Sequence, residues 1–517
     1  MTWSRYALYL LSILTNGSEW ADRTHFGWNA IQSGLNGFMS TLLDRLKELE
    51  LRTRPVDPHS AAALARRWDA LPEAQQIPTQ VLGRRTTGCE GTHGVFPKCD
   101  FACKPCYHSS DANKVRVDGP HTLSEVEKQM AFARETNATT SYAQLIGGEV
   151  SLLEPADHAA ALQIMRNYGR KPMSFSHGDF SYEYLRDIAL DSDGEPRFDE
   201  LSFACHIDTT MVGRTGIPKP ETEAQLNQVR ADFCAMFDRL EREHGVKSFL
   251  AHNMTVTPAN VGQIADVVSE CYDQGWRLFS FQPAAYIGNE SRWKEGFREV
   301  TSDVVWGEVE AGVGTRLPYE GLHVGDTRCT RSTWGAWIGD DFVPLVDDRD
   351  PLDLDFVATA LEAFPGNMIN LPTSVATLRI LRSVLATPAV APQAAAWLRR
   401  YVRRAGGLGS QWKSVRPMTF VMHQFIDAAD SAAAWEHITL GSRAEEPKIL
   451  AAQERLEACA YIMAHPADGQ SVPACVQHAV LDPAENRELA AQLPLRAPRS
   501  ESANESSNDG VSVSLTA

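Results

Sequence analysis

Short apolar runs alternate with amphipathic stretches between about residue 80 and residue 290. The runs are rich in β-branched and aromatic residues, which favours buried strands, and the stretches between them have apolar positions at helical spacing. We predict strands at residues 142–146, 172–176, 200–206, 248–256 and 278–284. We predict helices at residues 123–136, 155–168, 182–189, 221–244 and 260–274.

With one further strand placed just before Cys99, this pattern makes six strand–helix units. Such alternation requires a parallel sheet with crossover helices. Six units are too few for a closed barrel of eight strands. The predicted fold is therefore α/β, with a partial (β/α)6 barrel of the TIM type. In folds of this kind the chemistry lies at the carboxyl ends of the strands.

The N-terminal flank, residues 1–80, predicts a helical segment, because residues 38–49 and 61–68 are helical in pattern. An apolar run at residues 6–14 is too short to span a bilayer, and it lacks the basic flank and cleavage site of a signal peptide. We therefore expect a cytoplasmic protein. The sequence leaves open whether this run packs on the domain or makes a peripheral membrane contact.

The chain divides by pattern into the N-terminal segment, a core domain at residues 81–290 and a C-terminal extension at residues 291–495. The extension is expected to be irregular and mostly helical, with helices near 374–386 and 394–404, and to form a substrate or second-cluster region. Residues 496–517 are rich in Ser, Asn and Glu and predict a disordered tail.

The charge balance restricts the partners. The 517 residues include 49 Lys and Arg against 66 Asp and Glu, which gives a net charge of -17. Phosphate binding rests on clustered basic side chains, so a broad nucleic-acid surface is excluded. The composition is otherwise that of a globular protein, with 43% hydrophobic residues.

Three of the ten cysteines fall close together, in the segment Cys99-Asp-Phe-Ala-Cys103-Lys-Pro-Cys106. In a long chain without a secretion signal, such spacing indicates metal binding rather than disulfides. Three thiolates on one loop can ligate three irons of an iron–sulfur cubane and leave the fourth iron open to a small molecule. Zinc is the alternative; it would need a fourth ligand, for which Cys89, His93 and His108 are the nearest candidates.

A second motif follows about forty residues later, where Gly147, Gly148 and Glu149 end a predicted strand. Glycines at such a position let the backbone approach a ligand closely. A carboxylate beside them can accept hydrogen bonds from an ammonium group.

Together, the C-x3-C-x2-C triplet and the Gly-Gly-Glu strand end resemble the signature of the radical S-adenosylmethionine (SAM) superfamily. The resemblance implies a 4Fe-4S cluster on Cys99, Cys103 and Cys106, and binding of the SAM amino group by the segment that ends in Glu149. One position departs from the pattern. The residue before the last cysteine, often aromatic in the family, is Pro105, and an aromatic residue comes only after that cysteine.

The same resemblance implies contacts to the SAM ribose and carboxylate from the ends of the fourth and fifth strands, where we select Ser202, His206 and Asn253. His177 and Asp179 follow the third strand. We interpret them as candidate catalytic residues that face the substrate as an acid–base or hydrogen-bonding pair.

The other seven cysteines divide into two groups. Cys205, Cys234 and Cys271 lie in strand or helix patterns and are expected in the core. An auxiliary iron–sulfur cluster is left open for the remaining four, which are Cys89, Cys329, Cys459 and Cys475.

The implied reaction is reductive cleavage of SAM to a 5′-deoxyadenosyl radical, which abstracts hydrogen from an unactivated carbon. An electron donor such as flavodoxin or ferredoxin is implied with it. The Leu145–Glu149, Phe281–Pro283 and His465–Cys475 segments resemble, more weakly, the tetraether-lipid-synthase-like subgroup, which favours a lipid or other hydrophobic substrate. Two alternatives stay open: modification of a peptide or small metabolite, and a non-catalytic iron–sulfur or zinc-binding regulator.

Overall fold

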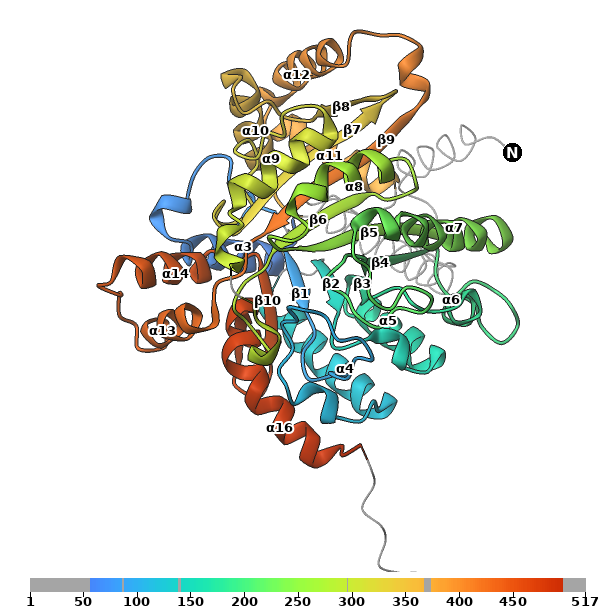
Figure 1. Cartoon of the computed structure of the whole chain (residues 1–517). Coiled ribbons are helices and arrows are strands. Elements are labelled where there is room, and N and C mark those ends of the chain that lie inside the picture. The colour runs from blue at the N-terminus through green and yellow to red at the C-terminus, as the bar shows by residue number, and fades with distance from the viewer. Residues whose placement is uncertain (1–55, 86–87, 138–140, 295, 367–372, 496–517) are drawn as a thin grey trace, which may run out of the picture.

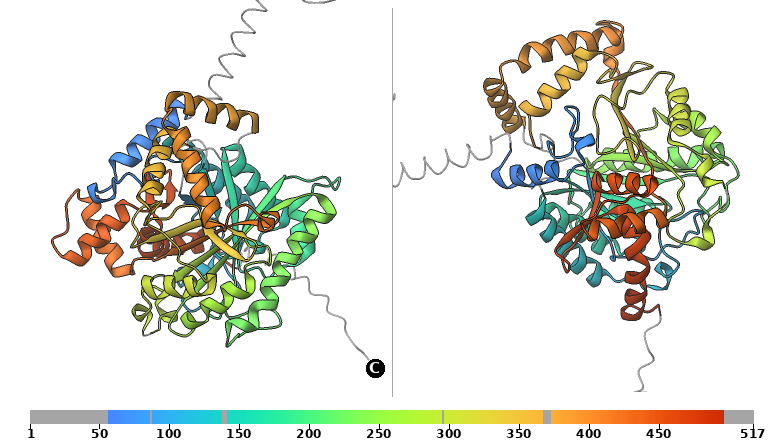
Figure 2. Two further views of the ribbon diagram at one scale, coloured as in Figure 1. Left: turned by 90° about the horizontal axis from the view of Figure 1, so that it is seen from above. Right: turned by 90° about the vertical axis from the view of Figure 1, so that its left-hand side faces the viewer.

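The structure of the chain is a computed structural model, which describes residues 56–85, 88–137, 141–294, 296–366 and 373–495. Its centre is an eleven-stranded sheet flanked by helices (Figures 1 and 2). The strands are β1 (Cys89–Gly91), β2 (Ser141–Leu145), β3 (Arg170–Ser176), β4 (Glu200–His206), β5 (Lys247–Val256), β6 (Leu278–Pro283), β7 (Thr330–Ile338), β8 (Asp341–Pro344), β9 (Val415–His423), β10 (Tyr461–His465) and β11 (Gln470–Pro473).

The strand order is β11-β10-β1-β2-β3-β4-β5-β6-β9-β7-β8. Neighbours from β10 through β1 to β6 and on to β9 are parallel, whereas β11, β7 and β8 join the edges antiparallel. Among the described strands, β11 and β8 each pair on one side only, so the sheet is open. The fold is therefore α/β, with the general form of a partial TIM-like barrel, as the sequence predicts.

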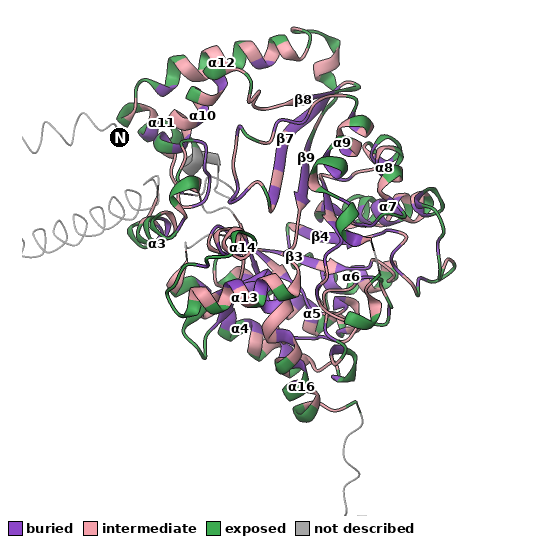
Figure 3. Cartoon of the chain, turned by 60° about the vertical axis from the view of Figure 1, so that its left-hand side comes forward, coloured by how far each residue is buried: buried purple, intermediate pink, exposed green. Residues whose placement is uncertain are grey.

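Helices α4 to α9 each follow one of the strands β1 to β6 in the chain. They bury one face of the sheet in the main core, where Leu145, Phe203, Phe279 and Phe420 are fully buried (Figure 3). The helices are α3 (Pro58–Asp69), α4 (Gly119–Thr136), α5 (Pro155–Asn167), α6 (Tyr182–Ala189), α7 (Asn227–His244), α8 (Ile264–Cys271), α9 (Ser302–Val313), α10 (Pro351–Ala363), α11 (Thr373–Ala386), α12 (Val390–Arg404), α13 (Ala428–Thr439), α14 (Pro447–Glu457), α15 (Ala474–Val476) and α16 (Asp482–Gln492).

The predicted elements of the core are found close to their expected bounds. Strands β2 to β6 begin and end within two residues of the prediction, and β4 and α6 coincide with it. Helix α4 begins four residues earlier than predicted, at Gly119, because the Asp118 side chain accepts a hydrogen bond from the His121 backbone and Pro120 occupies the first turn. Helix α7 begins six residues later than predicted, at Asn227, and ends as predicted at His244, before Gly245, which takes a left-handed conformation.

The count of six strand–helix units is not confirmed, because residues 291–495 add strands β7 to β11 to the same sheet. We expected this extension to be irregular and mostly helical. Its parallel strands have no alternating pattern: β10 is buried along its second half and β9 has three consecutive buried residues. A short strand covered on both faces has no period of two in its sequence.

Several predictions concern residues that the structure does not describe. The apolar run at 6–14, the helical pattern at 38–49 and the tail at 496–517 lie outside the described residues. The division into domains stays a prediction. Within the described part of the chain, no helix has both the length and the apolar character needed to cross a bilayer.

Candidate functional site

Cys99, Cys103 and Cys106 lie on one loop between β1 and the next helical turn. Two backbone hydrogen bonds join this loop to the segment that follows β4, from Ala102 to the Val212 carbonyl (2.8 Å) and from Lys104 to the Thr210 carbonyl (3.0 Å). The backbone N–H of Cys99 donates to the Asn113 side chain at 2.8 Å. The loop is therefore anchored to its surroundings on both sides of Cys103.

The pKa values of Cys99 and Cys103 are raised by burial and by neighbouring thiols of the loop. Burial raises the pKa of Cys103 well above its ordinary value, and the charges of Cys106 and Cys99 raise it further. Burial also raises the pKa of Cys99 to about 12, and there Cys106 acts in the same direction. Since thiolates are the metal-ligating form, thiols so placed lose their protons in exchange for a metal cation. The donor set fits an iron–sulfur cluster held by three cysteines.

Arg292 and Gly288 are site residues that the sequence analysis missed. The Arg292 guanidinium donates to the Cys103 carbonyl at 3.4 Å, and its charge lowers the pKa of Cys106 against the raising effect of burial. Gly288 has φ +74°, and a Cβ there would lie 2.4 Å from the Cys106 carbonyl oxygen. The Gly-Asn pair after β6 predicts a turn, but no local pattern indicates that this turn packs on the cysteine loop.

Gly147 and Gly148 pack against the segment that leads into Cys99. A Cβ at Gly147 would lie 2.7 Å from the Phe96 ring, and one at Gly148 would lie 1.9 Å from the Lys98 carbonyl oxygen. The N–H of Gly148 donates to the Phe96 carbonyl (2.7 Å), and the N–H of Glu149 donates to the Lys98 carbonyl (2.9 Å). The two glycines thus let the end of β2 support the start of the cysteine loop.

The Glu149 carboxylate is buried, with 1% of the residue exposed. It accepts hydrogen bonds from the Ser151 N–H (2.9 Å), the Ser176 hydroxyl (2.7 Å) and the His177 N–H (2.8 Å). This carboxylate therefore ties the end of β2 to the end of β3. Its expected contact with the SAM ammonium stays a prediction.

His177 reaches back to the cysteine loop. Its Nε2 lies 2.9 Å from an Asp100 carboxylate oxygen, so it donates there, and its Nδ1 accepts from the Asp179 N–H at 3.0 Å. The ring stacks on Phe101, with centroids 3.8 Å apart and planes at 9°. The Asp179 carboxylate accepts instead from the Thr215 N–H. The two side chains do not bond to each other, and their acid–base role stays a prediction.

These contacts make His177→Ala a discriminating variant. We expect the substitution to cost about 1–2 kcal/mol in local stability, since it removes a stacked ring and a hydrogen bond to a charged group. The loop should then retain less iron per chain after reconstitution. An acid–base role would give full iron with lost turnover, which would contradict this interpretation. His437→Ala, at a half-buried position on α13 away from the cysteine loop, is the matched control.

His206 and Asn253 are neighbours across the β4–β5 pairing, where they are register partners. The alternate residues of these strands, such as Phe203 and Leu250, belong to the main core, so both candidates face the opposite side. Burial lowers the pKa of His206 to about 4, which keeps its imidazole neutral at neutral pH. Ser202 shares this face but is about 13 Å deeper along β4, because strands rise about 3.3 Å per residue.

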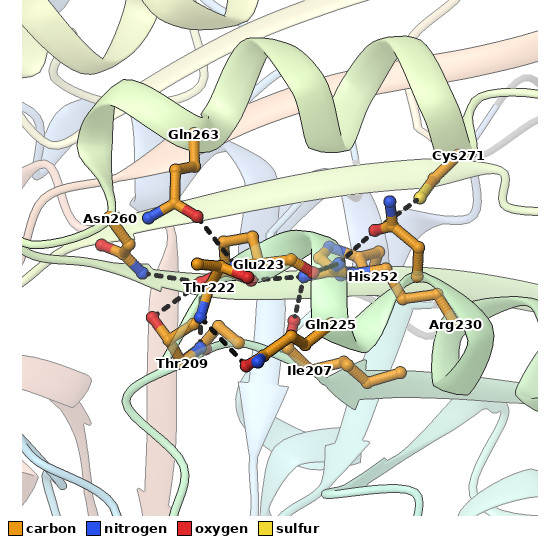
Figure 4. Close-up of polar contacts among 12 residues, drawn as sticks. Ile207, Thr209, Thr222, Glu223, Gln225, Arg230, His252, Asn260, Gln263 and Cys271 are labelled. Atoms are coloured by element: carbon orange, nitrogen blue, oxygen red, sulfur yellow. Dashed lines mark hydrogen bonds and ion pairs between the residues drawn. The ribbon is translucent and has the colours of Figure 1, made fainter. Parts of the chain in front are cut away.

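A buried ion pair lies behind the end of β4 (Figure 4). The Arg230 and Glu223 side chains are almost fully buried and 2.5 Å apart. Arg230 also donates to the Ile207 carbonyl and to the His252 ring, while the Thr209 N–H and hydroxyl donate to Glu223. The network therefore holds the segment against which the cysteine loop pairs.

The remaining cysteines separate as expected into two groups. Cys205, Cys234 and Cys271 are buried in the main core. In the other group, Cys329 lies 3.0 Å from the Arg455 guanidinium, and burial raises the pKa of Cys475 and Cys459, each raised further by the charge of a neighbouring cysteine. Cys89 lies in β1, where its N–H donates to the carbonyl of Ala460, the residue after Cys459 (3.0 Å). An auxiliary cluster stays a prediction.

Two of the three fourth ligands considered for zinc, His108 and His93, have other partners in this arrangement. The His108 ring donates to the Gly147 carbonyl, and His93 contacts Glu485 and the Ala464 carbonyl. His177 comes closer to the cysteines, with its ring nitrogen, Cys99 Sγ and an Asp100 oxygen within 4.8 Å of one another.

No protein-family model matches the chain, and no curated protein matches it. Solved structures match weakly. SuiB of Streptococcus suis matches with a TM-score of 0.26 and 13% sequence identity, and the match covers 38% of this chain and 40% of SuiB. The structure of SuiB bound to S-adenosylmethionine matches with a TM-score of 0.27 and 13% identity, covering 41% of this chain and 43% of SuiB. The structure of anSMEcpe with bound AdoMet and Cp18Cys peptide matches with a TM-score of 0.25 and 11% sequence identity, and the match covers 37% of this chain and 50% of that one. The chain thus spans half or less of the length of these three structures.

Proposed function

We propose that this chain is a radical SAM enzyme. The observation that carries the proposal is the cysteine loop: three thiols on one loop, which is hydrogen-bonded to the segment after β4 and has the Gly147–Glu149 turn packed against the residues that lead into it. A loop of this kind offers three thiolates and leaves one iron of a cubane without a protein ligand.

When bound, a 4Fe-4S cluster supplies one electron to the sulfonium of SAM, which yields methionine and a 5′-deoxyadenosyl radical able to take a hydrogen atom from a substrate carbon. The chain's own residues bind the cluster and orient SAM. Cys99, Cys103 and Cys106 hold the irons, and the Arg292 guanidinium offsets the negative charge of the thiolates.

The polar face of β4 and β5 is the proposed SAM surface. The proposal rests on the neutral His206 imidazole and the Asn253 amide, which are adjacent on neighbouring strands, and on Ser280, the register partner of Asn253 on β6. Such side chains hydrogen-bond to ribose hydroxyls and a carboxylate. Ser202 lies four residues before His206 on β4, too far from the strand end to join His206, Asn253 and Ser280.

The substrate class remains the less specific part of the proposal. A hydrophobic or lipid substrate follows only from the weaker sequence resemblance, and a peptide or small metabolite is the alternative. A one-electron donor of the flavodoxin or ferredoxin class would serve either reaction. A purely regulatory cluster protein would have no use for a SAM-binding face.

Release of 5′-deoxyadenosine tests the proposal. The anaerobically reconstituted chain, given dithionite and SAM, is expected to release it, and a Cys103→Ala variant is expected to release none, because one cluster ligand is lost. Cys234→Ala, a buried core position outside the loop, is the control that should retain release. No release by the wild-type chain under several reductants would overturn the proposal. Comparative lipid and metabolite profiling of a deletion strain then separates the substrate classes.

A further inference from the structure

A second group of ligand-type side chains lies away from the cysteine thiols. His93 follows β1, His465 ends β10 and Glu485 lies on α16, and one ligand atom from each lies within 4.8 Å of the others. The two imidazole rings stack with centroids 4.0 Å apart. Three segments distant in the sequence thus bring two histidines and one carboxylate together.

Hydrogen bonding fixes which nitrogen of His93 is available. Its Nε2 lies 2.9 Å from the Ala464 carbonyl oxygen, which can only accept, so Nε2 carries the proton. Its Nδ1 lies 3.0 Å from Glu485 Oε2. In the neutral ring this places the Nδ1 lone pair against a carboxylate oxygen. Two acceptors at that distance repel unless a proton or a metal cation lies between them.

His465 repeats the arrangement through Gln477. The Gln477 amide nitrogen donates to Asp482 and to Glu485, each at 2.9 Å, so its amide oxygen faces His465. The Nε2 of His465 therefore donates to that oxygen, and its Nδ1 lies 3.8 Å from Glu485 Oε1. Both histidines thus have an unprotonated Nδ1 near the Glu485 carboxylate, and the His465 Nδ1 also lies 3.9 Å from an Asp468 oxygen.

Ligating histidines in metal sites characteristically donate their other ring N–H to a carbonyl or carboxylate, which fixes the tautomer. Here a backbone carbonyl and a buried amide do this for His93 and His465. The Glu485 side chain is 27% exposed, which leaves a route for an ion and for water ligands.

We propose that His93, His465 and Glu485 bind a divalent transition-metal ion, for which Zn²⁺ is the best chemical match. Two imidazoles and one carboxylate with solvent-accessible positions are a donor set that Zn²⁺ takes in proteins. The ion would join α16 to β10 and to the segment that leads into the cysteine loop. The site is independent of the proposed function, since none of its ligands belongs to the cysteine triplet.

Metal binding by paired variants tests the site. The full chain, stripped with chelator, is given Zn²⁺ and desalted, and bound zinc is measured per chain. Glu485→Gln is expected to retain one equivalent fewer than wild type, while Glu488→Gln, exposed on the same helix, retains the wild-type amount. Zinc held by cysteine thiols is present in all three proteins and cancels from the difference.

A second substitution and a second metal show whether the lost zinc came from the site formed by His93, His465 and Glu485. His93→Gln should lose the same equivalent, and Co²⁺ in the wild-type chain should show a nitrogen–oxygen site whose visible absorption disappears in both variants. Iron loaded on the cysteine loop should be unchanged in Glu485→Gln, which separates this site from the proposed enzyme. Equal zinc in wild type and both variants would overturn the proposal, and would mean that a proton bridges His93 and Glu485.

Discussion

Gly148→Ala is expected to abolish iron retention by the cysteine loop and to destabilise the chain by about 3 kcal/mol, the upper part of the usual range for overpacking. The added Cβ would lie 1.9 Å from the Lys98 carbonyl oxygen and 2.4 Å from that of Pro97. Both obstacles are backbone atoms, so no side-chain rotation relieves the clash. The segment that leads into Cys99 must shift, and the thiols shift with it.

Iron content after anaerobic reconstitution and the midpoint of urea unfolding measure the two effects. Gly262→Ala is the matched control, because a Cβ there meets nothing within 4 Å and its φ is not positive. It should retain iron and change stability by less than about 1 kcal/mol. Wild-type iron in Gly148→Ala would show that the end of β2 does not support the loop, and would remove the structural role assigned to Gly148.

The sequence predicts candidate site residues best where they lie close together along the chain. Cys99, Cys103 and Cys106 lie within one short segment, residues 147–149 closely follow β2, and His206 ends the largely buried strand β4. The close approach of Gly147 and Gly148 to a ligand stays a prediction, and the structure adds that both glycines pack on Phe96 and Lys98. Backbone-to-backbone packing has no side-chain pattern from which the partner can be inferred.

The parts of the site that were missed come from distant segments. Arg292 contacts Cys103 through a carbonyl, and the loop pairs with Thr210 and Val212 through backbone groups that every residue has. The added strands were missed for a related reason. Strand β10 inserts beside β1 from the far end of the chain, and its register with Cys89 is set by the assembled sheet rather than by its own short sequence.

Arg230→Met is expected to lower the free energy of unfolding by about 3–5 kcal/mol, the range for removing one partner of a buried ion pair. The Glu223 carboxylate would keep the hydrogen bonds from Thr209 and Asn260 but lose the cation 2.5 Å away, in a position with no access to water. Burial holds the pKa of His252 well below its ordinary value, so its neutral ring would also lose the Arg230 donor.

A second substitution identifies the cause. Glu223→Gln in the Arg230→Met background removes the orphaned charge while its amide oxygen can still accept from Thr209, so it should recover part of the loss in urea unfolding. Arg239→Met is the surface comparison, since its ion pair with Glu243 is half exposed, and it should lower the free energy of unfolding far less than Arg230→Met does. If Arg230→Met cost no more than Arg239→Met, the buried pair would not be what holds the end of β4 against the cysteine loop.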